Sequence, residues 1–148
     1  MKKIISVILA AVLFCNFYPM YGQAAEKDTI YFADGSYATV EIVNVESRTS
    51  GSKTGRKTYT YYNSDSVAQW KVSLTASFTY NGSSATCTDS DISVVLYNSN
   101  CYVISRSSGK ENNIARGYAT IGRRLLGVTV DEKSTSLTLT CDANGNLS

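Results

Sequence analysis

Histidine is absent from this chain of 148 residues. Without an imidazole, neither a Ser-His-Asp triad nor a Cys-His pair can be built, and the commonest zinc ligand is missing. Three of the four cysteines, Cys87, Cys101 and Cys141, lie 14 and 40 positions apart, which is not the clustered spacing of a structural zinc site. An acid-pair or Ser-Lys enzyme stays formally open, but no pattern indicates one. We therefore expect a protein that is not an enzyme and has no metal or other cofactor.

Apart from its first residues, the chain has no excess of charge of either sign. The 14 lysines and arginines exceed the 12 acidic residues by 2, and Lys2 and Lys3 account for this excess. Beyond Ala24, 12 basic residues face 12 acidic ones. Binding to nucleic acid or to an anionic membrane depends on a sustained basic field. The charge balance therefore argues against a nucleic-acid partner and against electrostatic capture by a membrane.

The chain also lacks an apolar run long enough to span a bilayer, which takes roughly 20 residues. Its longest apolar run, Ile4 to Cys15, has 12 residues and follows the basic start Met1-Lys2-Lys3, which is the pattern of a signal peptide. We predict that residues 1–24 are this signal peptide, because small residues stand at the −3 and −1 positions before a cut after Ala24. Cleavage after Ala25 is the alternative. The mature chain should be secreted, with no stable membrane span.

The clearest pattern in the mature chain is a hairpin from Trp70 to Asp91. From Val72 to Tyr80, apolar residues alternate with serine and threonine, which is the period of a strand with one buried face. Asn81-Gly82 is the preferred pair for a two-residue type I′ turn. In that register Phe78 faces Ala85 and Ala76 faces Cys87, so that Cys87 points into the core.

The mature chain has no proline, and no stretch of it has the period of a helix. Strand-like segments instead follow one another about every ten residues, each bounded by a turn signal, which is typical of a β-sandwich or a small barrel. We predict an all-β fold, an antiparallel β-sandwich that is Ig-like or related. Residues 25–57 would form an N-terminal hairpin and a polar loop, and residues 58–148 the sandwich core, all in one domain. The other expected segments are Thr29–Ala33 and Ser36–Val45 around Asp34-Gly35, a flexible loop at Arg48–Gly55, and strands at Thr58–Tyr62, Ile92–Tyr97, Tyr102–Arg106, Ile114–Ile121, Leu125–Val130 and Thr135–Cys141.

Cys87 and Cys141 share the inward parity of their strands. Cys141 is in phase with Leu137 and Leu139, as Cys87 is with the apolar residues of its hairpin. In an exported chain such a pair should oxidise if the geometry permits, and closing the loop of 141 minus 87, or 54, positions would stabilise the fold by about 4 kcal/mol. Cys101 could be a buried free thiol, the true partner of either other cysteine, or a site of intermolecular linkage. The buried thiol is the simplest of the three, since a free cysteine usually behaves as a small hydrophobe.

Three segments give the chain a resemblance to a family. They are TYTYYNSDSVAQWKVSLTASFTYNGSSATCT from Thr58 to Thr88, GYAT from Gly117 to Thr120, and the ending SLTLTCDANGNLS. On these segments the chain resembles an uncharacterised family of short secreted all-β proteins from Gram-positive, largely gut-dwelling bacteria. The resemblance implies a two-cysteine domain in which Cys87 and Cys141 pair. It gives Cys101 no role and implies no activity.

The segment from Arg48 to Tyr62 is the strongest candidate for binding, because it combines four cations and three tyrosines with no acid. Cations beside tyrosines suit stacking on sugar rings or contacts with an acidic polymer or protein. The alternative is an edge strand whose lysines discourage aggregation and whose tyrosines form cross-strand pairs. We place the possible ligand surface at Arg56, Lys57, Tyr59 and Tyr61.

Two classes of function fit these observations. The first is a secreted non-catalytic module that recognises an extracellular glycan or protein. The second is a small secreted effector or toxin-like protein that acts on other cells, or a minor hydrolase. The lack of histidine and of clustered acids favours the first.

Overall fold

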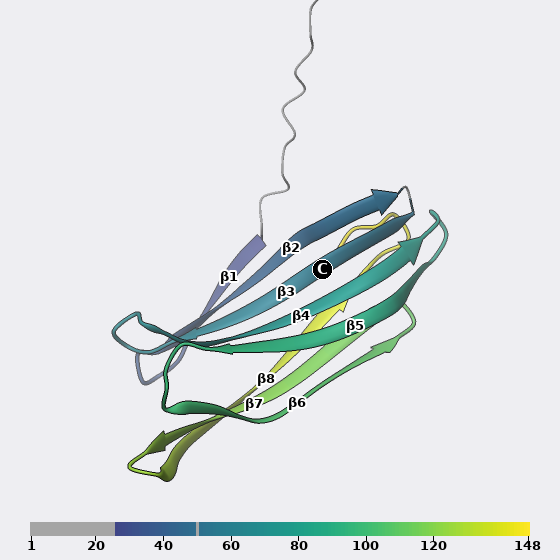
Figure 1. Ribbon diagram of the computed structural model, residues 1–148. Helices are drawn as coiled ribbons and strands as arrows, with labels where there is room; N and C mark the ends of the chain where they lie inside the picture. The colour runs from purple at the N-terminus through teal and green to yellow at the C-terminus, as the bar shows by residue number, and fades with distance from the viewer. Residues whose placement is uncertain (1–25, 50) are drawn as a thin grey trace, which may run out of the picture.

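The computed structural model describes residues 26–49 and 51–148, and this part of the chain consists of eight strands without a helix (Figure 1). The predicted all-β class is confirmed. The predicted signal peptide, residues 1–24, and both cleavage positions lie outside the described residues. The strands are β1 Glu26–Tyr31, β2 Tyr37–Thr49, β3 Ser52–Tyr62, β4 Ala68–Tyr80, β5 Ala85–Leu96, β6 Cys101–Glu111, β7 Ile114–Leu125 and β8 Val128–Thr140.

The strands form two sheets that lie one over the other (Figure 1). The larger sheet has the order β1-β2-β3-β4-β5 and the smaller one the order β6-β7-β8, and every pair is antiparallel. An antiparallel β-sandwich is therefore confirmed. Its connectivity is a plain meander, because neighbours in each sheet are consecutive in the chain, whereas immunoglobulin domains have Greek-key connections.

The core lies between the inner faces of the two sheets. Of the residues predicted to face inward from Val72 to Tyr80, the first four are buried as predicted and Tyr80 is half-buried. Trp70, which has the same parity, is buried too. These residues pack against small and apolar residues of the other sheet, so every second residue of β4 contributes to the core. The facing residues are Ala115, Ala119 and Ile121 on β7 and Leu137 and Leu139 on β8.

The register of the β4–β5 hairpin differs from the prediction. Phe78 pairs with Cys87, and Tyr80 pairs with Ala85. The turn contains four residues instead of two, because the side-chain oxygen of Asn81 accepts the backbone N–H groups of Ser83 and Ser84 at 3.0 and 2.9 Å. The shift is two residues, which preserves parity, so Cys87 is still buried.

Two of the expected loops are strand. Residues Arg48–Gly55 were expected to form a flexible loop, but β2 continues to Thr49 and β3 begins at Ser52. The predicted strand Leu125–Val130 is wrong, because Leu125 ends β7 and the β7–β8 turn at Leu126 and Gly127 interrupts it. β8 then runs unbroken from Val128 to Thr140, so the residues expected to separate it from the predicted strand Thr135–Cys141 are strand as well. In both places the polar residues resemble turn signals, but in a sandwich such residues also mark the solvent face of a long strand.

The β7–β8 turn is strained at Leu126. Leu126 and Gly127 are the two residues between Leu125 and Val128, and both have positive φ angles, 50° and 82°, as in a type I′ turn. The Leu126 side chain is 97% exposed, so it contributes no packing that would offset the steric cost of this conformation.

We expect Leu126→Asn to raise the free energy of unfolding by about 0.5–1 kcal/mol, because asparagine tolerates the left-handed region that costs leucine roughly 1 kcal/mol. Urea denaturation measures the change. Leu125→Asn is the control, since Leu125 has no positive φ, and it should give no gain. A loss of stability in Leu126→Asn would contradict this explanation of the turn.

Candidate functional site

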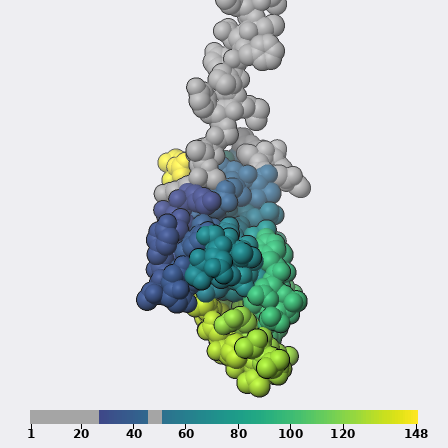
Figure 2. All heavy atoms as spheres, turned by 90° about the vertical axis from the view of Figure 1, so that its left-hand side faces the viewer, coloured from purple at the N-terminus to yellow at the C-terminus, as the bar shows by residue number. Residues whose placement is uncertain are grey.

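A polar cleft of about 530 Å³ opens at one end of the sandwich. Figure 2 looks onto this end, where the β7–β8 hairpin projects beyond the rest of the domain. The cleft is formed where several elements meet, namely the β1–β2, β3–β4 and β5–β6 loops and the facing parts of β7 and β8. Its lining includes Asp34, Ser36, Tyr61, Asn63, Gln69, Trp70, Asn98, Cys101, Arg123, Asp131 and Lys133.

Stacked aromatic rings form the base of the cleft. Tyr61 and Trp70 are cross-strand neighbours whose ring centroids lie 5.2 Å apart at an interplanar angle of 24°. Tyr59 stacks on Trp70 as well, at 5.5 Å and 18°. The Lys133 ammonium lies 5.1 Å from the centroid of the Tyr61 ring, within the range of a cation–π interaction. A cation is therefore held directly over the aromatic base.

Two amides make a fixed wall of the cleft. The Gln69 side chain donates to the carbonyl of Val67 at 2.9 Å and accepts from the Asn98 side chain at 2.6 Å. The backbone carbonyl of Gln69 also accepts from the N–H groups of Tyr97 and Asn98. These bonds tie the start of β4 to the loop after β5. The amides are therefore pre-organised, which lowers the entropy cost of binding a ligand.

The charged groups of the cleft balance one another. Asp34 and Asp131 are acidic and Arg123 and Lys133 are basic. Hydrogen bonds from the Ser36 hydroxyl and backbone N–H hold the pKa of Asp34 below its ordinary value, and nearby Lys133 adds to this effect. Arg123 and Asp131 face each other across the β7–β8 pair. A cleft with both signs in equal number suits an uncharged polar ligand better than an ion.

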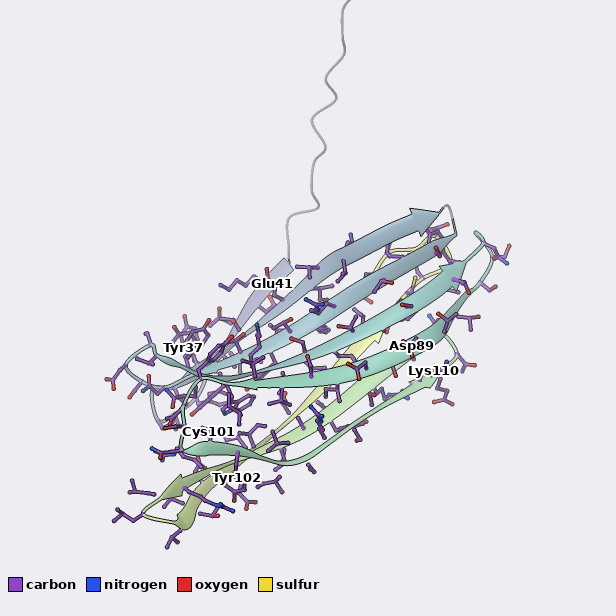
Figure 3. The ribbon with its side chains drawn as sticks, viewed as in Figure 1. Tyr37, Glu41, Asp89, Cys101, Tyr102 and Lys110 are labelled. Carbon is purple, nitrogen blue, oxygen red and sulfur yellow. The ribbon has the colours of Figure 1, made fainter. Side chains whose placement is uncertain are left out.

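Cys101 is a buried free thiol at the edge of this cleft. Burial raises the pKa of the thiol, Arg123 opposes the shift and Asp131 adds to it. A thiol with a raised pKa stays protonated at neutral pH and is a poor nucleophile. Figure 3 places Cys101 at one end of the sandwich and Asp89, two residues after Cys87, at the other, so the structure gives no support to a bond from Cys101 to Cys87.

Cys87 and Cys141 lie together at the far end of the sandwich. The N–H of Cys87 donates to the carbonyl of Asn112 at 2.7 Å, and the N–H of Cys141 donates to that of Asn113 at 3.1 Å. For each thiol burial is the main cause of a raised pKa, and the nearness of Cys87 contributes to the shift of Cys141. Within the described residues both are free thiols and no disulfide is formed, so the predicted bond is not present in this structure.

The four predicted ligand residues do not share one surface. Because side chains of β3 alternate, Arg56 lies on the outer face, where its Nε donates to the Thr75 hydroxyl at 3.2 Å. Tyr61 lies at the base of the end cleft, whereas Lys57 and Tyr59 line a second hollow beside β8. The side chain of Arg48 lies outside the described ones. Whether any of these residues binds a ligand stays a prediction.

Sequence reasoning missed most of the cleft. Gln69 and Asn98 look like ordinary polar residues at strand ends, and Asp131 and Lys133 fall between the predicted strands Leu125–Val130 and Thr135–Cys141, although both belong to β8. No local signal could have joined them, because they come from segments that only the sheet order brings together.

The half-buried Tyr59 gives the fold a measurable pH dependence. Burial, and to a smaller extent Tyr61, raises the pKa of its phenol from 10.0 to about 12. The unfolded chain releases this proton near pH 10 while the folded protein keeps it, so this contribution to stability is full below pH 10 and is lost as the pH rises towards 12.

We therefore expect the free energy of unfolding of the reduced protein to decline above about pH 9, where the buried thiols also begin to favour the unfolded state. Urea denaturation from about pH 8 to about pH 12 measures it. Tyr59→Phe should flatten the decline above pH 10, whereas Tyr31→Phe, at a side chain 78% exposed, should keep the wild-type slope. Equal slopes in the two variants would contradict the assignment.

Comparisons with protein families, curated proteins and solved structures found no match for the chain. Among the residues that the structure describes, there is no candidate for a membrane-spanning helix. The same residues contain no group of three or more His, Cys, Asp or Glu side chains placed to hold a metal ion.

Proposed function

We propose that this is a secreted, non-catalytic binding protein whose end cleft takes a neutral saccharide unit of an extracellular glycan. The observation that carries the proposal is the end cleft itself, in which pre-organised amides, two acids and two cations surround an aromatic base. Sugar hydroxyl groups both donate and accept hydrogen bonds, so they pair with carboxylates, amides and guanidinium groups alike. The apolar face of a pyranose suits an aromatic edge.

The chemistry of the cleft supports binding rather than catalysis. A general acid needs a pKa near the working pH, but the hydrogen bonds from Ser36 hold the pKa of Asp34 below its ordinary value. Burial raises the pKa of the Cys101 thiol, which keeps it protonated and weakly nucleophilic. Since the chain contains no histidine, the commonest proton-transfer residue is missing as well.

The location in this proposal rests on the N-terminal pattern of residues 1–24, and a Gram-positive source rests on the family resemblance. We expect the mature protein to begin at Ala25 or Glu26. Mass spectrometry of the culture supernatant tests this start. An intact Met1 on protein recovered from the cytoplasm would contradict it.

The binding proposal is tested by isothermal titration calorimetry with a panel of neutral and acidic mono- to tetrasaccharides. We expect at least one neutral saccharide to bind to the wild-type protein. Asp131→Asn should weaken that binding about tenfold or more, because a carboxylate that accepts hydrogen bonds from sugar hydroxyls is worth roughly 1.5–3 kcal/mol. Arg106→Ala is the control, since Arg106 is exposed on β6 and is not part of the cleft lining, and it should bind as the wild type does.

Two outcomes would refute the proposal. The first is that no neutral saccharide in the panel binds. The second is that Asp131→Asn and Arg106→Ala bind equally well while both remain folded, which would place the saccharide elsewhere on the molecule.

A further inference from the structure

A groove of about 720 Å³ runs along β8, under the overhanging part of the larger sheet. In the described part of the chain β3 is the outermost strand of the larger sheet that contacts β8, so β2 and β1 extend past it. The inner faces of these two strands are therefore left without a covering sheet. Ile30 has inward parity on β1 and is nevertheless 44% exposed, and Val40 and Ile42 on β2 are half-buried.

The edge of β8 that faces this groove has no partner over most of its length. β8 pairs with β7 on its other side, and on the groove side the described residues pair with it only at its C-terminal end, through the Cys141–Leu147 bridge and Ser148. Exposed edges are normally protected by charge, proline or short length. The stretch Ser134–Thr140 contains neither a charged residue nor a proline.

The other sheet edges are protected. β1 has six residues, three of which are charged. The edges of β5 and β6 face each other, where the Ser108 hydroxyl donates to the carbonyl of Ser90 at 3.2 Å and the Lys110 ammonium donates to that of Thr88. The unprotected β8 edge is therefore a specific feature of this fold, and it coincides with the uncovered apolar face.

The C-terminal residues show how a strand adds to this edge. The N–H of Thr140 donates to the carbonyl of Ser148 at 2.9 Å, and the N–H of Ser148 donates back at 3.0 Å, which is a closed antiparallel pair. Because backbone groups of a strand alternate in direction, Thr138, Ser136 and Ser134 present their N–H and C=O groups on the same side as Thr140. Residues paired with Leu137 and Thr135 would point inward, as Leu147 does where it packs near Gly55.

We propose that the groove binds one extended segment of a partner polypeptide, which adds to β8 as an antiparallel strand. Its alternate residues are apolar and insert towards Val40, Ile42 and Tyr59, while the others face solvent. Main-chain hydrogen bonds to Ser134, Ser136 and Thr138 supply affinity, and the apolar pockets supply selectivity, as in other cases of strand addition. The residues of the segment whose N–H groups point towards β8 cannot be proline, because each of these N–H groups donates a hydrogen bond to β8.

A second copy of the whole domain does not fit the groove. Antiparallel pairing of two β8 edges would keep both larger sheets on the same side of the joined smaller sheets. The overhanging β1 and β2 of each copy would then occupy the same space. A single extended segment occupies only the hollow beneath the overhang, so the geometry favours a flexible peptide over another folded domain.

Fluorescence polarisation with two labelled peptides tests the proposal. The first peptide has the sequence Lys-Thr-Ile-Ser-Val-Thr-Leu-Ser-Lys, with apolar residues at alternate positions, and the second has the same composition with its three apolar residues adjacent. We expect saturable binding of the alternating peptide and at least tenfold weaker binding of the rearranged one. Hydrogen exchange should show slower exchange of the Ser134, Ser136 and Thr138 amides in the complex.

A matched pair of variants locates the site. Ile42 and Val43 are neighbours on β2, both half-buried, but Ile42 lines the groove and Val43 has the opposite parity. Ile42→Lys should weaken binding of the alternating peptide at least tenfold, and Val43→Lys should bind as the wild type does. Ser136→Pro removes one N–H on the groove edge of β8. Because this N–H makes no hydrogen bond to β7, the circular dichroism spectrum should be unchanged, while binding of the alternating peptide should be abolished.

Three results would overturn the proposal. They are equal affinity for the two peptides, wild-type affinity in folded Ile42→Lys, and the lack of binding by either peptide to the wild-type protein. A concentration-dependent dimer that is abolished by Ser136→Pro would assign the edge to self-association instead. None of these results bears on saccharide binding in the end cleft, which is formed by other residues.

Discussion

Trp70→Ala is expected to lower the free energy of unfolding by about 3–5 kcal/mol, the usual cost of removing a large buried aromatic side chain. Trp70 is 3% exposed and stacks on both Tyr59 and Tyr61. Its removal would leave a cavity between the sheets and also remove the support of the end cleft. Urea denaturation of the wild type and the variant measures the loss.

The control for this prediction is Tyr31→Ala. The Tyr31 ring is mostly exposed, and its centroid lies 5.9 Å from that of the Tyr37 ring. It should cost less than about 1 kcal/mol, because little apolar area is lost. Trp70→Phe should fall between the two, since it keeps a ring in the stack. A loss below about 1 kcal/mol in Trp70→Ala would show that the aromatic stack does not stabilise the sandwich.

Oxidation of Cys87 and Cys141 to a disulfide is expected to stabilise the protein by about 4 kcal/mol, from the loop-entropy estimate for a loop of 54 positions. The proposal that this bond forms in the oxidising exterior rests on two observations. Both thiols are buried at the same end of the sandwich, and their backbones bond to the adjacent residues Asn112 and Asn113.

Non-reducing peptide mapping and urea denaturation with and without a reductant test the bond. Reduction should destabilise the wild type and Cys101→Ala by the same amount, and it should leave the Cys87→Ala, Cys141→Ala double variant unchanged. Recovery of Cys101 in the main intramolecular bridge would show that strand parity had selected the wrong pair. Stability that does not respond to reduction would show that the bond is not formed.

The two-residue period explains why strands and buried faces could be predicted. The inward parity of Trp70 to Phe78 and of Cys87 is a local property, so it survived a hairpin register that was wrong by two residues. The register itself depends on hydrogen bonds made by the Asn81 side chain, and further along the hairpin on a bulge in β5, where Thr88 has no partner between the Ser77–Asp89 and Phe78–Cys87 pairs. Neither is encoded by the alternation of apolar and polar residues.

The candidate sites were predicted less well, because they depend on the relation between the sheets. Strand parity alone separates Arg56 from Lys57 and Tyr59, so that part of the result is contained in the sequence. The pairing of a five-stranded sheet with a three-stranded one could not be derived locally. This unequal pairing leaves the groove along β8 open. The end cleft is enclosed by loops at one end of the same sandwich.

The most direct test of saccharide binding at the end cleft is a nuclear magnetic resonance titration of labelled protein with the saccharide identified by calorimetry. The chain has one tryptophan, so the indole N–H of Trp70 gives a single resonance at the base of the cleft. We predict that this resonance and the side-chain amides of Gln69 and Asn98 shift together and saturate with one dissociation constant, while Gly109 on β6 stays unchanged. Saturable binding that leaves all three cleft resonances in place would contradict the proposed site.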